Sequence, residues 1–189
     1  MRKKIISALM TASLLLLSAC GDSGDITGEI QKTYSEAPDV TINTRLRADY
    51  GENVYDFTLS CGFSDEGGTV TITEPEEISG VTARVEADGV ALSYEGAEVF
   101  TGALLPDGMS PVESVGVMLR AWREGYVTES VSESYGDVPC QALTFRISDA
   151  SELRTWFDRE TLLPLHAEIY SNGFAVILCD FENVVIVSR

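Results

Sequence analysis

Strict alternation of apolar and polar residues between positions 55 and 63 is the feature that most limits what this chain can fold into. The apolar members of this run are Tyr55, Phe57, Leu59, Cys61 and Phe63. A period of two predicts a β-strand with one buried face, because successive side chains of a strand point to opposite faces. Similar alternation in TVTIT, in VTARVEADG and from Val90 to Tyr94, with short turns between, predicts an antiparallel meander.

One helix is predicted after these strands. Ser110 fits the N-cap position, Pro111 fits the first helical position, and Glu113 completes a capping box. The apolar stripe that follows consists of Val112, Val115, Met118, Leu119 and Trp122. Gly125 is placed to end this helix in the left-handed conformation. A weaker helical pattern runs from Ile26 to Glu36, where apolar residues recur every four positions.

Period-two alternation returns after this helix and continues to the end of the chain. Asn172 and Gly173 are the preferred pair for a type I′ hairpin turn between the last two strands. In the stretch FAVILC both phases of the alternation are apolar, which predicts a strand that is buried on both faces. The predicted fold class is therefore mainly β (α+β), with an antiparallel sheet and one main helix.

The stretch WFDRETLLPLHAEIYSNGFAVILCDFENVVI resembles the C-terminal half of LolA-like, outer-membrane lipoprotein-sorting folds, and also the GerS-type germination lipoproteins. Its elements are a strand ending at Asp158, a turn through Thr161, an LPL strand, a hairpin and a final strand. The resemblance implies a strongly curved antiparallel sheet, an open half-barrel, with the main helix on its concave side. It extends over most of residues 28–188.

In such folds an apolar hollow between helix and sheet binds acyl chains or lipids, or the scaffold binds a protein partner. The candidate cavity residues here are Tyr55, Phe57, Leu59, Val115, Met118, Leu119 and Trp122. Each of them also fits an ordinary core. We therefore hold two hypotheses: an apolar-ligand binding protein, and a non-catalytic scaffold or partner for an envelope or cell-wall-processing protein. The first requires a continuous apolar hollow, and the second requires a filled core with an exposed apolar patch.

The N-terminal residues predict export and anchoring. Three basic residues precede an apolar run from Ile5 to Leu17, which is too short to span a membrane, because a spanning helix needs about 20 apolar residues. The following LSAC resembles the lipobox of bacterial lipoprotein precursors, so Cys20 is the expected lipidation site; the alternative is an ordinary secretory signal with a chance cysteine. The predicted organisation is a signal peptide over 1–19, an acylated Cys20 with a tether over 20–28, and one domain over 29–189.

The charge balance restricts the partners. The chain has 13 basic and 30 acidic residues, and three of the basic ones lie in the signal, which leaves a mature chain with a formal charge of about −20. Such a domain is repelled by nucleic acid and by anionic headgroups. An acidic surface that keeps the exported domain in solution and a surface that recognises a cationic ligand both fit this charge. The expected location is the extracytoplasmic face of a membrane, with an outer membrane not excluded.

The remaining cysteines and the single histidine provide few candidates for chemistry. Cys61, Cys140 and Cys179 fit buried free thiols, and the pair Cys140 with Cys179 is the disulfide to test first. His166 alternates with apolar neighbours and fits a solvent-facing position on a strand; a role as a general base is the alternative. Neither a metal site, a cofactor nor an enzymatic activity is expected.

Overall fold

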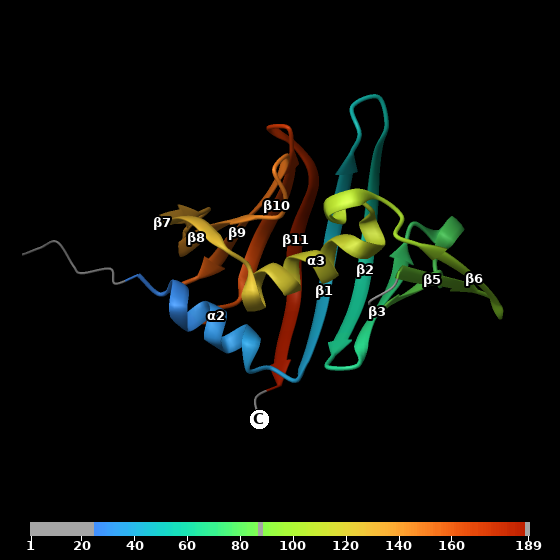
Figure 1. The fold of residues 1–189 in the computed structure, drawn as a ribbon, viewed down its shortest axis with the longest axis horizontal. Coiled ribbons are helices and arrows are strands. Elements are labelled where there is room, and N and C mark those ends of the chain that lie inside the picture. Colours follow the sequence, from blue (N-terminus) through green and yellow to red (C-terminus); the bar gives the residue numbers. More distant parts are fainter. Residues whose placement is uncertain (1–24, 87–88, 188–189) are drawn as a thin grey trace, which may run out of the picture.

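The computed structural model describes residues 25–86 and 89–187. These residues form one eleven-stranded antiparallel sheet in the order β6-β5-β4-β3-β2-β1-β11-β10-β9-β8-β7 (Figure 1). Neighbours in the sheet are also neighbours along the chain, except where β1 pairs with β11. The sheet is therefore two meanders joined at its centre, and it ends in two edge strands, β6 and β7.

The strands of the first meander are β1 (Asp39–Asp49), β2 (Val54–Ser64), β3 (Gly67–Glu74), β4 (Thr82–Glu86), β5 (Gly89–Tyr94) and β6 (Ala97–Gly102). Those of the second are β7 (Val127–Tyr135), β8 (Val138–Arg146), β9 (Ser151–Asp158), β10 (Pro164–Ser171) and β11 (Phe174–Val187). Short 3₁₀ turns cover Glu76–Ile78 (η1) and Pro106–Gly108 (η2). The expected Asn172-Gly173 turn joins β10 to β11, with φ values of 50° and 82°.

Two helices lie on one face of the sheet, α2 (Thr27–Ser35) and α3 (Pro111–Glu124) (Figure 1). They pack against each other, and α3 contacts β2, β3 and β4. We call the face that they cover the concave face and the opposite one the outer face. The predicted fold class, an open and mainly β half-barrel with its main helix on the concave side, is confirmed.

Two details of α3 differ from the prediction. Ser110 makes no side-chain cap, and Glu113 instead accepts hydrogen bonds from the backbone N–H groups of Leu104 and Leu105. Gly125 is extended, with φ −68° and ψ 151°, rather than left-handed. Glycine is needed there because a Cβ would lie 2.5 Å from the carbonyl oxygen of Ala121.

Of the segment predicted as a tether, residues 27 and 28 belong to α2, which begins at Thr27. The predicted signal peptide, Cys20 and residues 21–24 lie outside the described residues. Among the described residues, no helix is long and apolar enough to cross a membrane.

Candidate functional site

The concave interior is filled by side chains from both helices and the sheet. Trp122 of α3 is fully buried and lies 5.2 Å from Tyr34 of α2, 5.6 Å from Phe157 and 5.5 Å from Phe181, measured between ring centroids. Its indole N–H donates to the hydroxyl of Thr155 over 3.0 Å. The phenol of Tyr34 in turn donates to the carbonyl of Leu162. These partners fix the ring and fill the space between helix and sheet.

The seven predicted cavity residues separate into two groups. The buried group has exposed fractions of 0–2% and consists of Leu59, Val115, Met118, Leu119 and Trp122. The other two, Tyr55 and Phe57, lie at the start of β2. This part of the strand is not paired with β3, because the pairing of β2 with β3 runs only from Thr58 to Ser64. There Tyr55 is 48% exposed and Phe57 is half-buried. The structure does not bring all seven together around one hollow.

A hollow of about 730 Å³ opens at the rim of the concave side, between α3 and the β2–β3 hairpin. Its apolar lining includes Phe63, Val85 and Leu119, and its polar rim includes Arg120 and Glu124. The ring of Phe63 is wedged between two glycines. A Cβ on Gly68 would lie 2.4 Å from the Phe63 ring, and one on Gly116 would lie 3.4 Å from it. Phe63 therefore closes the interior at this point.

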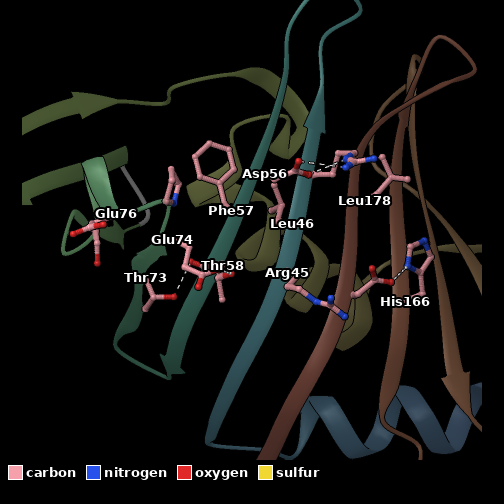
Figure 2. Close-up of a pocket in the computed structure, with 14 residues that line it drawn as sticks. Arg45, Leu46, Asp56, Phe57, Thr58, Thr73, Glu74, Glu76, His166 and Leu178 are labelled. Carbon is pink, nitrogen blue, oxygen red and sulfur yellow. Dashed lines mark hydrogen bonds and ion pairs between the residues drawn. The ribbon is translucent and has the colours of Figure 1, made fainter.

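A second hollow, of about 790 Å³, lies across the outer face and is drawn in Figure 2. Figure 2 shows Arg45 and His166 on the side of β1 and β10, and on the other side Glu74, the last residue of β3, and Glu76 of η1. Both arginines of this hollow are already paired with carboxylates. Arg45 contacts Glu182 over 2.9 Å, and Arg47 contacts Asp56 over 2.8 Å.

His166 lies at one end of this outer hollow and is 7% exposed, so the expectation of a solvent-facing histidine was wrong. Its Nδ1 is 2.7 Å from Asp180 Oδ1, and its Nε2 is 3.2 Å from Glu168 Oε1. The ring of Tyr135, from the end of β7, stacks on the imidazole at 5.0 Å, and the Tyr135 hydroxyl donates to Asp180. This burial was not predictable from the local sequence, because Tyr135, which covers the imidazole, belongs to a strand that is distant along the chain.

These contacts set the direction in which the pKa of His166 is shifted. Burial by itself lowers the pKa of the imidazole, but the hydrogen bonds to Glu168 and Asp180 outweigh it, and the net pKa is raised. The same hydrogen bond from His166 lowers the pKa of Glu168. Both ring nitrogens face carboxylates, so neither is available to take a proton from a substrate. The arrangement is a structural clamp between β7, β10 and β11.

The three cysteines that the structure describes, Cys61, Cys140 and Cys179, are free and buried. Gln141, Leu143 and Phe145 share one face of β8, and the last two belong to the concave core. Cys140 has the opposite phase along the strand, so its side chain lies on the outer face. Cys179, in contrast, belongs to the concave core. The pair that we selected for a disulfide test is therefore wrong, because its members lie on opposite faces. Among the described residues, no group of three metal-binding side chains is present.

Exposed apolar side chains occur on both faces of the sheet at its β5–β6 end and in the segment that follows β6. They are Tyr94 (44% exposed), Val99 (61%), Phe100 (59%) and Leu105 (44%). We did not predict this surface from the sequence. The signal available in the sequence was the adjacent pair Val99 and Phe100, which gives a short strand an apolar residue on each face.

Neither a protein-family model nor a curated protein matches this sequence. Among solved structures, an uncharacterized conserved protein from Thermus thermophilus is similar with a TM-score of 0.51 and 8% identity, over 87% of this chain and 86% of that one. An outer membrane lipoprotein-sorting protein domain from Vibrio parahaemolyticus has a TM-score of 0.46 and 10% identity, over 85% and 90%. A LolA superfamily protein from Nitrosomonas europaea has a TM-score of 0.43 and 13% identity, over 88% and 96%.

LolA-superfamily proteins are thus among the structures that this chain is similar to, as the sequence resemblance predicted. At these identities the likeness concerns the fold alone.

Proposed function

We propose that this protein is a lipid-anchored, non-catalytic binding protein of the extracytoplasmic envelope, which docks a protein partner through the β5–β6 end of its sheet. The observation that carries the proposal is the combination of a filled concave interior with exposed apolar side chains at that end. Of the two hypotheses drawn from the sequence, the scaffold or partner hypothesis requires this combination.

An acyl chain could enter the concave interior only by displacing side chains. Trp122, Tyr34 and Phe157 are each fully buried and contact one another. Displacing one of these rings from the interior into water loses about 1.5–3 kcal/mol of burial free energy for each large side chain. The energetic cost disfavours an acyl-chain carrier that loads through this interior.

Apolar-ligand binding is retained as a second candidate, and the rim hollow favours it. Phe63, Val85 and Leu119 give this hollow an apolar wall, and rotation of the Phe63 ring away from Gly68 would enlarge it. The same hollow carries charged residues at its mouth, where a ligand's polar group would remain in water.

Acylation of Cys20 is part of the proposal. Two acyl chains hold a protein on a membrane stably, whereas one gives only marginal binding. Five peptide units separate Cys20 from Asp25, so the anchor lies at most about 17 Å from that residue. Asp25 and Thr27 contact Ser130 of β7. The proposed anchor therefore lies on the β7 side, and β6 lies at the opposite end of the sheet (Figure 1).

Substitution of Cys20 by serine in the native host tests the anchor. We expect the protein to move from the membrane fraction to the soluble fraction. An unchanged membrane fraction would contradict the lipidation proposal and leave the docking proposal to its own test.

Site-specific photocrosslinking in living cells tests the docking proposal. A photoreactive residue is placed at Val99, at Phe174 or at Tyr126, which are exposed by 61%, 76% and 71% and lie in different parts of the chain. We expect a discrete protein adduct from position 99 and weaker or no adducts from the other two. The absence of a discrete protein adduct at position 99, whatever forms at the other two positions, would overturn docking through the β5–β6 end.

A further inference from the structure

The two edges of the sheet differ in how they are protected. At β7 the exposed side chains are mostly serine, threonine and glutamate, Ser130 is held by Asp25 and Thr27, and Tyr135 is held over His166. At β6 five of the six residues are exposed. Two of these, Val99 and Phe100, are large and apolar. Exposed apolar edge strands readily pair with another chain, and proteins ordinarily protect them with charges, prolines or covering segments.

The free backbone groups of β6 follow from its hairpin with β5. Glu95 and Gly96 form a two-residue turn with positive φ values, so the flanking pair Tyr94 and Ala97 exchanges hydrogen bonds. Antiparallel pairs alternate between bonded and non-bonded. Val99 therefore directs its N–H and C=O toward β5, whereas those of Glu98 and Phe100 point to the open edge.

The side chains of β6 lie on both faces of the sheet. Val99 is opposite Leu92, which is opposite Ala83 of the concave core, so Val99 extends the concave face. Phe100 is opposite Ala91 and Arg84 on the outer face, where Glu98 also pairs with Arg84 over 2.7 Å. An added strand would therefore meet one apolar side chain on each face and, beside the outer one, the Glu98 carboxylate with its Arg84 partner.

We propose that β6 accepts an extended segment of the protein partner as an added strand, and that this segment carries apolar residues next to Val99 and Phe100 and basic residues facing Glu95 and Glu98. This inference rests on the proposed function and specifies the chemistry of its partner. Backbone hydrogen bonds to Glu98 and Phe100 supply affinity, and the flanking side chains supply selectivity.

Charge and geometry favour a basic partner segment over a second copy or a lipid surface. Two copies pairing through β6 would each bring Glu95 and Glu98 into the interface, and each mature chain carries a formal charge of about −20, so they repel each other. A lipid surface is disfavoured because the proposed anchor lies at the β7 side of the sheet, remote from β6 (Figure 1).

Hydrogen exchange of the purified full-length lipoprotein in detergent tests the geometry with a defined probe. The probe is a capped hexapeptide with the sequence VVKTTK at millimolar concentration, which in an antiparallel added strand places its two valines beside Phe100 and Val99 and a lysine beside Glu98. Its control is the same peptide with its first and third backbone amides N-methylated, which removes the donors that would face the open edge of β6. We expect the unmethylated peptide to slow exchange of the Glu98 and Phe100 amides at least threefold, with no slowing at the Ser130 amide of β7. Equal effects of both peptides, or none at Glu98 and Phe100, would overturn the inference.

A proline substitution tests the same geometry in cells. Glu98→Pro removes an outward N–H without removing a hydrogen bond to β5, and proline is tolerated on edge strands. Its matched control, Glu98→Ala, loses the same carboxylate and ion pair but keeps the N–H. We expect Glu98→Pro to reduce the crosslink from position 99 at least tenfold and Glu98→Ala to reduce it no more than threefold. Equal reductions would contradict strand addition.

The outcomes separate this inference from the function on which it rests. Adducts from position 99 that persist in Glu98→Pro leave docking at the β5–β6 end in place and refute strand addition at β6. Absence of an adduct from position 99 in the unmodified chain refutes docking at that end itself. If Glu98→Pro lowers the unfolding temperature by more than 5 °C relative to Glu98→Ala, the hydrogen-exchange result decides.

Discussion

Replacement of Trp122 by alanine measures directly whether the concave interior is a packed core. The side chain is 0% exposed, contacts three aromatic rings and donates a hydrogen bond to Thr155. Deleting a buried tryptophan costs about 3–5 kcal/mol in the free energy of unfolding, because burial is lost and a cavity is left. With a urea dependence of about 2 kcal/mol/M, the unfolding midpoint falls by roughly 1.5–2.5 M.

Urea titration followed by far-ultraviolet circular dichroism gives this midpoint, and Tyr126→Ala provides the control. Tyr126 lies just beyond α3 and is 71% exposed, so its removal changes the free energy of unfolding by no more than about 0.5 kcal/mol. A ring that lined an open, ligand-ready hollow would lose little packing. A loss below about 1.5 kcal/mol for Trp122→Ala would therefore refute the packed-core interpretation.

Individual contacts elsewhere in the fold lead to three more predictions. Gly68→Ala destabilises the fold by about 1–3 kcal/mol, because its Cβ overlaps the Phe63 ring, whereas Gly62→Ala, with nothing within 4 Å of its Cβ, is nearly neutral in the same urea titration. The raised pKa of His166 means that its stabilising contribution is fully present below about pH 6.5, the pKa in the unfolded chain, and is lost as pH rises through the folded pKa. The stability difference between the unmodified protein and His166→Gln should therefore shrink above pH 6.5, and a difference independent of pH from 5 to 9 would contradict the clamp. Burial raises the pKa of the Cys61 thiol to about 12 and also raises those of Cys140 and Cys179, so a thiol reagent at pH 8 should label none of the three until urea unfolds the protein; rapid labelling of the native protein would refute this.

The elements of the fold were predictable because they depend on local patterns. Three features each depend on a short stretch of sequence, and the structure contains all of them: the alternation in β2, the apolar stripe of α3 and the Asn172-Gly173 turn. Details that depend on the surroundings were not predictable. Glu113 satisfies the backbone of Leu104 and Leu105 instead of capping its own helix, because the chain before α3 passes close to it.

The candidate site was predicted less well than the fold, for a physical reason. Periodicity indicates which side chains share a face, but not whether space remains between two faces. Leu59 and Trp122 do lie on facing surfaces, yet Tyr34 of α2 and Phe157 of β9 occupy the space between helix and sheet. The burial of His166 likewise depends on Tyr135 of β7, three strands away in the sheet.

Mass spectrometry of organic extracts from the purified lipoprotein tests the central claim most directly, because covalently attached acyl chains on Cys20 stay with the protein while any bound lipid is released. A packed concave interior predicts no lipid at a constant ratio to protein after detergent exchange. Recovery of about one acyl lipid per protein molecule, reduced by a substitution at Trp122 or Phe63, would contradict the account and identify the protein as an apolar-ligand carrier.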